Sequence, residues 1–343
     1  MPVTIRPMTP RDGPSWDSFV LSAEGGTFFH LAGWKRIFVE AFGLTPHFLL
    51  AERDGSIVGI LSLVHQKSVL FGNALISAPF LVEGGPLANN ADIRKALDGA
   101  ALELMPRTGA TYVEFRSRIA SREGWVCRKG LYATFKRPIS LVDEENLLAI
   151  PRKQRAVVRK TLNGSLTSIV DKTADRFFRV YAESVRNLGT PVFSKRYFAL
   201  LLETFSRSCD IIVVLDHGQP VSAVLNFYFK DTVLPYYGGG TSEARRNGAN
   251  DFLYWEVMRR AAARGYRQFD FGRSKSETGA FKFKKNWGFE PEWLEYEYFL
   301  GSGQSLPEKN PNNPRYKFAI EAWKYLPLPL ANFLGPFLIS GLG

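Results

Sequence analysis

Two stretches of the chain repeat the same order of hydrophobic and polar positions. The first opens with HFLLAERDGSIVGILSLVHQ and the second with DIIVVLDHGQPVSAVLNFYF, each a pair of apolar runs around a Gly-containing turn. Such runs around Asp54-Gly55 and His217-Gly218 predict β-hairpins. Each hairpin is followed by a glycine-bearing loop, a helical pattern and a further apolar run. The repeated order predicts a duplicated α/β unit.

The boundaries of the repeat follow from its helical patterns. In the second unit, Asn250 or Asp251 is placed to cap a helix that stops at Gly265. Further helical patterns precede each hairpin, and the connecting segment changes from acidic to basic just before residue 151. We therefore predict an N-terminal domain over 1–150 and a C-terminal domain over 151–300, each a mixed, mostly antiparallel sheet flanked by helices.

Residues 301–343 are expected to form a Pro-rich apolar tail. The last 18 residues carry no charge, but Pro327, Pro329 and Pro336 interrupt any membrane-spanning helix. We expect the tail, and residues 326–343 in particular, to pack on the domain or to lie at a membrane surface.

Composition narrows the possible partners and the compartment. The net charge is +11 over 343 residues, which favours anionic binding partners such as nucleic acid, an anionic membrane face or phosphorylated ligands. The two cysteines form no C-x-x-C pair, so no disulfide framework or zinc site is predicted, and no metal is expected. The opening MPVTIRPMTPRDGPSW has no apolar region behind a basic start, so we expect a cytoplasmic protein without a cleaved signal peptide.

The segment GGGTSEARRNGAN allows two interpretations. It is either a loop that binds an anion against a helix N-terminus or a turn with solvated charges. Together with FFHLAGW, FLVEGGP, FDFGRS and FKFKKNWGF, the order of hairpin, R-x-x-G-x-G/A-like loop, helix and strand resembles the FemAB-like family of aminoacyl/peptidyltransferases in the GNAT superfamily. The sequence is most similar to FemAB-related proteins of the exosortase/PEP-CTERM system.

The resemblance implies two tandem GNAT-like domains, with the donor site in the second. Arg245, Gly248 and Asn250 would hold the donor anion, although Asn250 departs from the Gly or Ala of the family pattern. The co-substrate would be acyl-CoA or aminoacyl-tRNA. The basic charge of the chain suits binding of tRNA. Fem enzymes that use tRNA often carry an inserted coiled-coil arm, and this sequence has no long heptad insertion, so the resemblance does not decide between the two donors.

The resemblance also places catalytic residues near the end of the second unit. Lys284 of FKFKKNWGF would stabilise charge on the reacting carbonyl, with Lys282 and Lys285 as alternatives. In an extended segment Lys282 and Lys284 face one side and Lys285 the other, and a solvated basic edge strand is the competing interpretation. Asp270 would accept a proton or bind nearby backbone. Tyr237, or its neighbour Tyr236, would act as an acid or pack in the core.

Acceptor-binding residues are expected in both halves. Arg152, Arg155 and Arg159 share one helical face, and the resemblance directs Arg155 above all toward a diphosphate-linked sugar. A solvated basic face is the alternative. Trp34 and Lys35 match the acceptor side of the first domain more weakly.

The expected function is acyl or aminoacyl transfer to an amine, or a hydroxyl, of a cell-envelope or exopolysaccharide precursor. The partners would be the acyl donor, a sugar-diphosphate or glycan-precursor acceptor, and the inner face of the cytoplasmic membrane through the tail. The alternative is a non-catalytic GNAT-fold module that binds an anionic glycan, RNA or a membrane surface.

Overall fold

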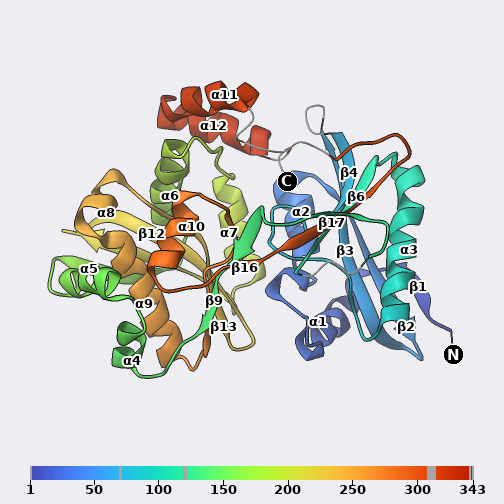
Figure 1. Cartoon of the computed structure of the whole chain (residues 1–343), viewed down its shortest axis with the longest axis horizontal. Helices are drawn as coiled ribbons and strands as arrows, with labels where there is room; N and C mark the ends of the chain where they lie inside the picture. Colours follow the sequence, from blue (N-terminus) through green and yellow to red (C-terminus); the bar gives the residue numbers. More distant parts are fainter. Residues whose placement is uncertain (1, 69–71, 119–121, 307–313, 340, 342–343) are drawn as a thin grey trace. The chain divides into compact units, whose positions relative to one another are not determined.

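The computed structural model describes residues 2–68, 72–118, 122–306, 314–339 and 341 (Figure 1). The chain divides into two compact units. Unit 1 consists of Met1–Tyr132, Trp293–Lys309 and Ser340–Gly343, and unit 2 of Ala133–Glu292 and Asn310–Ile339.

Unit 1 is built on a sheet with the strand order β1-β2-β3-β4-β6-β17-β7, in which β5 also pairs with β3. The strands β4 and β6 are parallel, and the other pairs are antiparallel. The strands are Thr4–Pro7 (β1), Thr45–Arg53 (β2), Ser56–Ser68 (β3), Gly72–Ser77 (β4), Leu87–Ala88 (β5), Tyr112–Ser117 (β6), Val126–Arg128 (β7) and Glu295–Leu300 (β17). The helical segments are Pro10–Asp12 (η1), Gly13–Ser22 (α1), Phe28–His30 (η2), Trp34–Phe42 (α2) and Ala91–Thr108 (α3).

Unit 2 is built on a second sheet with the order β10-β11-β12-β13-β14-β9. Its strands are Lys136–Pro138 (β9), Leu166–Asp171 (β10), Cys209–Asp216 (β11), Gln219–Phe229 (β12), Thr232–Gly240 (β13) and Gln268–Asp270 (β14). Only β13 and β14 are parallel within this sheet. Tyr132–Thr134 (β8), Ser274–Lys275 (β15) and Glu292–Trp293 (β16) form a small sheet in the order β15-β8-β16.

Helices cover both faces of the unit 2 sheet. At adjacent positions of β13, a side chain on Gly238 would meet Tyr254 of α9, and one on Gly239 would meet Ser184 of α6, so α9 and α6 lie on opposite faces. The helices are Asp143–Leu148 (α4), Arg152–Leu162 (α5), Asp175–Asn187 (α6), Lys195–Thr204 (α7), Ser242–Asn247 (α8), Ala249–Ala263 (α9), Gly279–Asn286 (α10), Pro314–Lys324 (α11) and Leu328–Ile339 (α12).

Both predicted hairpins are confirmed. Asp54-Gly55 joins β2 to β3 and His217-Gly218 joins β11 to β12, with positive φ at all four residues. Two consecutive left-handed residues match the twist of the flanking strands, which is why Gly follows a polar residue at both turns. The expected α/β architecture, with mostly antiparallel sheets flanked by helices, is confirmed as well.

The unit boundaries differ from those predicted. The strand β9 lies before residue 151 but pairs with β14, so residues 133–150 belong to unit 2. The strand β17 lies within the range 151–300 predicted for the C-terminal domain, but it pairs with β6 and β7 of unit 1. The predicted tail is not separate either, because α11 and α12 pack on α6. Apolar patterning identifies a strand but carries no information on its partner.

Candidate functional site

The central feature of unit 2 is a split between β13 and β14. Their parallel ladder joins only Thr232 to Gln268 and Val233 to Phe269. On its other edge β13 stays paired with β12 up to Gly240. Residues 234–240 therefore have no strand partner on the β14 side within the described chain, which leaves a strand edge able to bind an extended ligand.

The three glycines expected in a loop instead form the end of β13. A Cβ on Gly238 would lie 2.7 Å from the Tyr254 hydroxyl, and one on Gly240 would lie 2.3 Å from Asn250 Oδ1. Both distances are too short for a side chain. The glycines are thus explained by the close approach of α9 to the strand, not by a turn.

The predicted donor motif Arg245, Gly248, Asn250 spans the junction of α8 and α9. Arg245 is exposed on α8, and Gly248 links the two helices with φ +77°. A Cβ on Gly248 would lie 2.8 Å from Thr161 Cγ2, so this glycine also lets α5 pack on the junction.

One main-chain amide at the start of α9 is already hydrogen-bonded within the chain. The Ala249 N–H donates to Asn247 Oδ1 at 3.0 Å, and Asn247 Nδ2 donates to Asp216 Oδ2 at 2.9 Å. Asn250 Oδ1 accepts from Ser222 Oγ at 2.7 Å. The amide of Ala249 is not free for an anion, because an Asn two residues ahead supplies its acceptor. An anion that bound this amide would have to displace the Asn247 side chain.

Alanine at Gly248 is expected to destabilise the protein more than alanine at Gly218. Both positions have positive φ, which costs about 1 kcal/mol for alanine. A side chain on Gly248 also clashes with Thr161, whereas Gly218 faces open space. The clash should add about 1–3 kcal/mol, measured by urea unfolding of G248A and G218A. Equal losses would contradict the tight contact with α5.

Lys284 lies in a helix, not in the expected extended segment. Thr278 Oγ1 accepts from the Phe281 N–H at 3.3 Å and caps α10, so the Phe and Lys positions repeat at helical spacing. Phe281 and Lys284 are buried, while Lys282 and Lys285 are exposed. The structure therefore distinguishes one buried lysine from its two solvated neighbours.

The Lys284 ammonium group is held by backbone carbonyls. Its Nζ donates to Gly272 O at 2.8 Å and to Arg273 O at 3.2 Å, and lies 5.4 Å from the centre of the Phe135 ring. Burial lowers its pKa to about 7, although the negative charge of Asp270 opposes this shift. At neutral pH this amine can therefore both carry and release a proton.

Asp270 shapes the turn that presents these carbonyls. It is buried at the end of β14, where Oδ1 accepts from Thr134 Oγ1 at 2.9 Å and from the Gly272 N–H at 2.8 Å. A Cβ on Gly272 would lie 3.8 Å from the Tyr236 ring of β13, so this turn adjoins the split. Of the two roles expected for Asp270, the structure shows the binding of a nearby backbone N–H.

Tyr237 belongs to a buried aromatic cluster on the α6 face. Its hydroxyl lies 2.7 Å from that of Tyr197, and its ring packs against Tyr181 and Phe198. Burial raises its pKa well above the ordinary value of 10. Tyr237 therefore has a packing role and not the acid role that was one of its two expected roles. Because side chains alternate along β13, Tyr237 points to the same face as Gly239, toward α6.

Tyr254 is a site residue that the sequence pattern did not reveal. Its hydroxyl lies beside Gly238 beyond the end of the β13–β14 ladder, and its ring packs on Phe271 and Phe283. Within the part of the chain that the structure describes, this hydroxyl has no hydrogen bond. Burial, and secondarily the charge of Asp251, raises its pKa to about 12. A tyrosine in an apolar helix pattern is indistinguishable from core, so no sequence signal marked it.

Asp251 lies one turn before Tyr254 and is buried, whereas Tyr254 is partly buried. Its carboxylate accepts from Trp287 Nε1 at 2.9 Å and from the Gln154 side-chain amide. Burial raises its pKa. Asp251 thus connects α9 to α5 and to the residue that follows α10. The expected cap at Asn250 or Asp251 is wrong, because α9 begins at Ala249 with Gly248 at its N-cap.

The basic helix predicted at the start of the C-terminal domain is confirmed as α5. Arg155 Nη1 donates to Leu148 O at 3.1 Å, and Arg159 pairs with Glu144 at 3.0 Å. Arg152 is exposed. Arg155 and Arg159 thus both reach α4 or the residues at its end, and their role toward an acceptor stays a prediction.

The two predicted acceptor residues of unit 1 have structural contacts. Trp34 is 1% exposed, and its Nε1 donates to Phe28 O at 3.0 Å. Lys35 Nζ donates to Met8 O at 2.7 Å, and burial lowers its pKa. The expectation that Trp34 contacts an acceptor is wrong, because η2 and α2 turn the indole into an aromatic cluster with Phe28 and Phe38.

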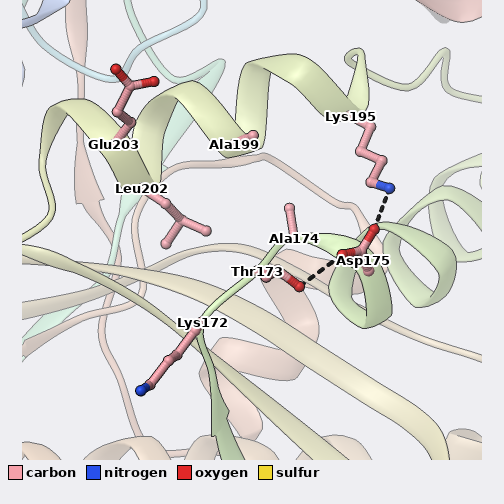
Figure 2. Close-up of a pocket in the computed structure, with 8 residues that line it drawn as sticks. All are labelled: Lys172, Thr173, Ala174, Asp175, Lys195, Ala199, Leu202 and Glu203. Atoms are coloured by element: carbon pink, nitrogen blue, oxygen red, sulfur yellow. Dashed lines mark hydrogen bonds and ion pairs between the residues drawn. The ribbon is translucent and has the colours of Figure 1, made fainter.

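A separate pocket of about 450 Å³ lies between the start of α6 and α7 (Figure 2). Its charged groups are largely paired, since Asp175 accepts from Thr173 Oγ1 and binds Lys195. None of the predicted site residues lines it. In the described ranges, no group of three His, Cys, Asp or Glu side chains is arranged to hold a metal ion.

Comparison with known proteins identifies this architecture. Residues 152–285 match the family described as acetyltransferase (GNAT) domain, over the region from α5 to α10 that contains the β13–β14 split. Over these residues the C-terminal unit is similar to a GNAT domain. A search of curated proteins found no match.

Solved structures extend the likeness beyond the GNAT domain. FemX is 16% identical, with a TM-score of 0.68 over 87% of this chain and 97% of FemX. A tandem GNAT protein from the clavulanic acid biosynthesis pathway is 13% identical, with a TM-score of 0.57 over 89% and 100%. L-PGS from Bacillus licheniformis is 15% identical, with a TM-score of 0.55 over 97% of each chain. At these identities the likeness concerns the fold.

These findings confirm the resemblance to the FemAB-like group of the GNAT superfamily and the tandem GNAT-like fold. A GNAT acyltransferase fold implies acyl-CoA or aminoacyl-tRNA as co-substrate. The link to the exosortase/PEP-CTERM system stays a prediction.

Proposed function

We propose that the chain transfers an acyl or aminoacyl group to an amine, or a hydroxyl, of a cell-envelope or exopolysaccharide precursor. The observation that carries the proposal is a buried lysine bound to the carbonyl of Gly272, in a turn that adjoins the unpaired edge of β13 within the region that matches a GNAT domain. A lysine that merely lay on a solvated helix face would be exposed and would have no backbone carbonyl partners. Lys284 is buried and has two such partners.

In the proposed mechanism the donor lies extended along the free edge of β13. Arg245, in the last turn of α8, is the exposed cation of the donor motif and would bind the donor phosphate. Because Gly238 has no side chain, the Tyr254 hydroxyl lies directly against the strand, where the proposed donor would pass.

The acceptor amine would attack the donor carbonyl directly and form a C–N bond. The protonated form of Lys284, which the charge of Asp270 favours against the larger effect of burial, would stabilise the negative charge that develops on the carbonyl oxygen. The C–S bond of a thioester, or the ester C–O bond of an aminoacyl-tRNA, then breaks. Tyr254 would give its proton to that leaving group and regain one from the attacking nitrogen through solvent.

The acceptor is proposed to be a sugar diphosphate or another glycan precursor. Arg152, Arg155 and Arg159 share a side of α5, and Gln154 of the same helix binds Asp251 beneath Tyr254. A phosphate bound on α5 would thus contact the helix whose Gln154 is hydrogen-bonded to α9, the helix that carries Tyr254. Arginine suits this task because its planar guanidinium pairs two phosphate oxygens at once.

The capped amide of Ala249 is the observation that favours the second candidate, a non-catalytic module for an anionic glycan, RNA or a membrane surface. In such a module the donor site would have been lost while the basic faces remained. The two candidates differ in whether any donor binds and turns over.

Thermal unfolding with candidate ligands tests the proposal. Acetyl-CoA, longer acyl-CoAs, aminoacyl-tRNA and nucleotide-sugar diphosphates are compared, because a ligand at 100 times its Kd adds about 2.7 kcal/mol of stability. We expect one donor class and a sugar diphosphate to stabilise the protein, and the pair to yield product by mass spectrometry. Stabilisation by glycans or RNA without any product would favour the module.

A further inference from the structure

The C-terminal helix α12 is apolar on both of its sides. One side packs on unit 2, since Ala331, Gly335 and Ile339 are buried at a spacing of four residues. A Cβ on Gly335 would lie 2.8 Å from both the backbone N and O of Val192, so the helix backbone rests directly on this segment.

The opposite side of α12 carries large exposed side chains. Phe333 and Phe337 are 66% and 70% exposed and pack edge to face with ring centres 5.8 Å apart. Leu330 shares this side at helical spacing and is 43% exposed. Exposing two phenylalanines and a leucine together is unfavourable in water, and a helix that is apolar all round is normally covered on every side.

The exposed side is fixed in place and is not a consequence of fraying. Arg186 of α6 donates to the carbonyls of Lys324 and Leu326, each at 3.2 Å, and so anchors the turn between α11 and α12. Figure 1 shows the two helices at one edge of unit 2, and both contact α6.

The charge around α12 indicates what covers it. From Tyr325 to residue 343 the sequence has no charged residue, whereas α11 before it carries three cations and one acid in its sequence. The whole chain has a net charge of +11. A second copy of the chain would bring the same positive charge against this edge, while an anionic lipid surface complements it.

The length of α12 sets the mode of contact. Twelve residues of helix span about 18 Å, too short for the roughly 30 Å of a bilayer core. Over the described ranges, no helix is both long and apolar enough to cross a membrane. Exposed aromatic side chains beside cations are typical of helices that lie in the plane of the membrane interface.

We propose that α12 docks the protein onto an anionic bilayer surface, with Phe333, Phe337 and Leu330 inserted among the acyl chains. Tyr325, which is 84% exposed at the turn between α11 and α12, would lie at the headgroup level. This proposal is independent of the acyl transfer, because it concerns binding to lipid and not turnover.

The test is co-sedimentation with vesicles of phosphatidylcholine alone and of phosphatidylcholine mixed with phosphatidylglycerol. We expect binding to the mixed vesicles that weakens as salt is raised, since screening reduces the headgroup attraction. The double variant F333S/F337S should bind at least about tenfold more weakly, or about 1.4 kcal/mol. Both side chains are exposed, so thermal unfolding should confirm an intact fold.

A matched control removes two exposed apolar side chains elsewhere. Leu21 and Val39 of unit 1 are 52% and 48% exposed on α1 and α2, and L21S/V39S should bind vesicles like the wild type. Absence of wild-type binding, or equal binding by F333S/F337S, would overturn the proposal. A change in oligomeric state of F333S/F337S with unchanged vesicle binding would instead assign the face to contact between copies.

Discussion

The K284M variant is expected to lose at least about a hundredfold in kcat while it still binds the donor. Removing one group that stabilises a developing oxyanion typically costs a factor of 10² to 10³. Methionine keeps the length and fills the space between Phe135 and Phe271, so the fold should persist. The measurement is turnover with the donor that stabilises the protein, alongside Kd from the same thermal shift.

Lys285 provides the matched control for this variant. It lies one residue further along α10 but is exposed, so K285M removes the same charge without touching the buried carbonyl contacts. K285M should keep the turnover of the wild type. If K284M and K285M lost activity equally, or if K284M lost donor binding instead of turnover, Lys284 would have no specific role in the chemical step.

The elements of the fold were largely predictable because local signals specify them. Alternating apolar residues around Asp54-Gly55 and His217-Gly218 predicted two hairpins that are present, and helical spacing predicted α5 and α9. The placement of β9 and β17 was not predictable, since their partners β14 and β6 lie far away in the sequence. Strand pairing depends on the tertiary structure, which local propensity does not encode.

The candidate site was predictable only in part. The resemblance to Fem-type proteins singled out Lys284, and its role stays a prediction. The Thr278 cap that makes its segment helical was overlooked. The glycines of β13 were interpreted as a loop because a run of glycine is ambiguous without knowing that Tyr254 packs against it. Trp34 had the residue type of a binding site, yet its burial depends on rings brought together by folding.

The buried amine of Lys284 should also give the protein a distinctive dependence of stability on pH. Its pKa is about 7 when folded, against an ordinary value of 10.5 when the chain is unfolded. Between these values the unfolded chain binds the proton and the folded chain releases it, so the free energy of unfolding rises with pH. From this group alone the rise between pH 7 and pH 9 is about 2 kcal/mol, and below pH 7 it flattens because both states are protonated.

Urea unfolding of the wild type and K284M at pH 7, 8 and 9 measures this effect. The difference between the two proteins removes contributions from other groups, including buried tyrosines such as Tyr237, whose raised pKa acts with the opposite sign above pH 10. K284M should be more stable at pH 7, and the difference should shrink as pH rises. Parallel curves would mean that the folded protein holds Lys284 fully charged. The amine would then have no proton to exchange near neutrality, and its contribution to acyl transfer would be limited to a fixed positive charge.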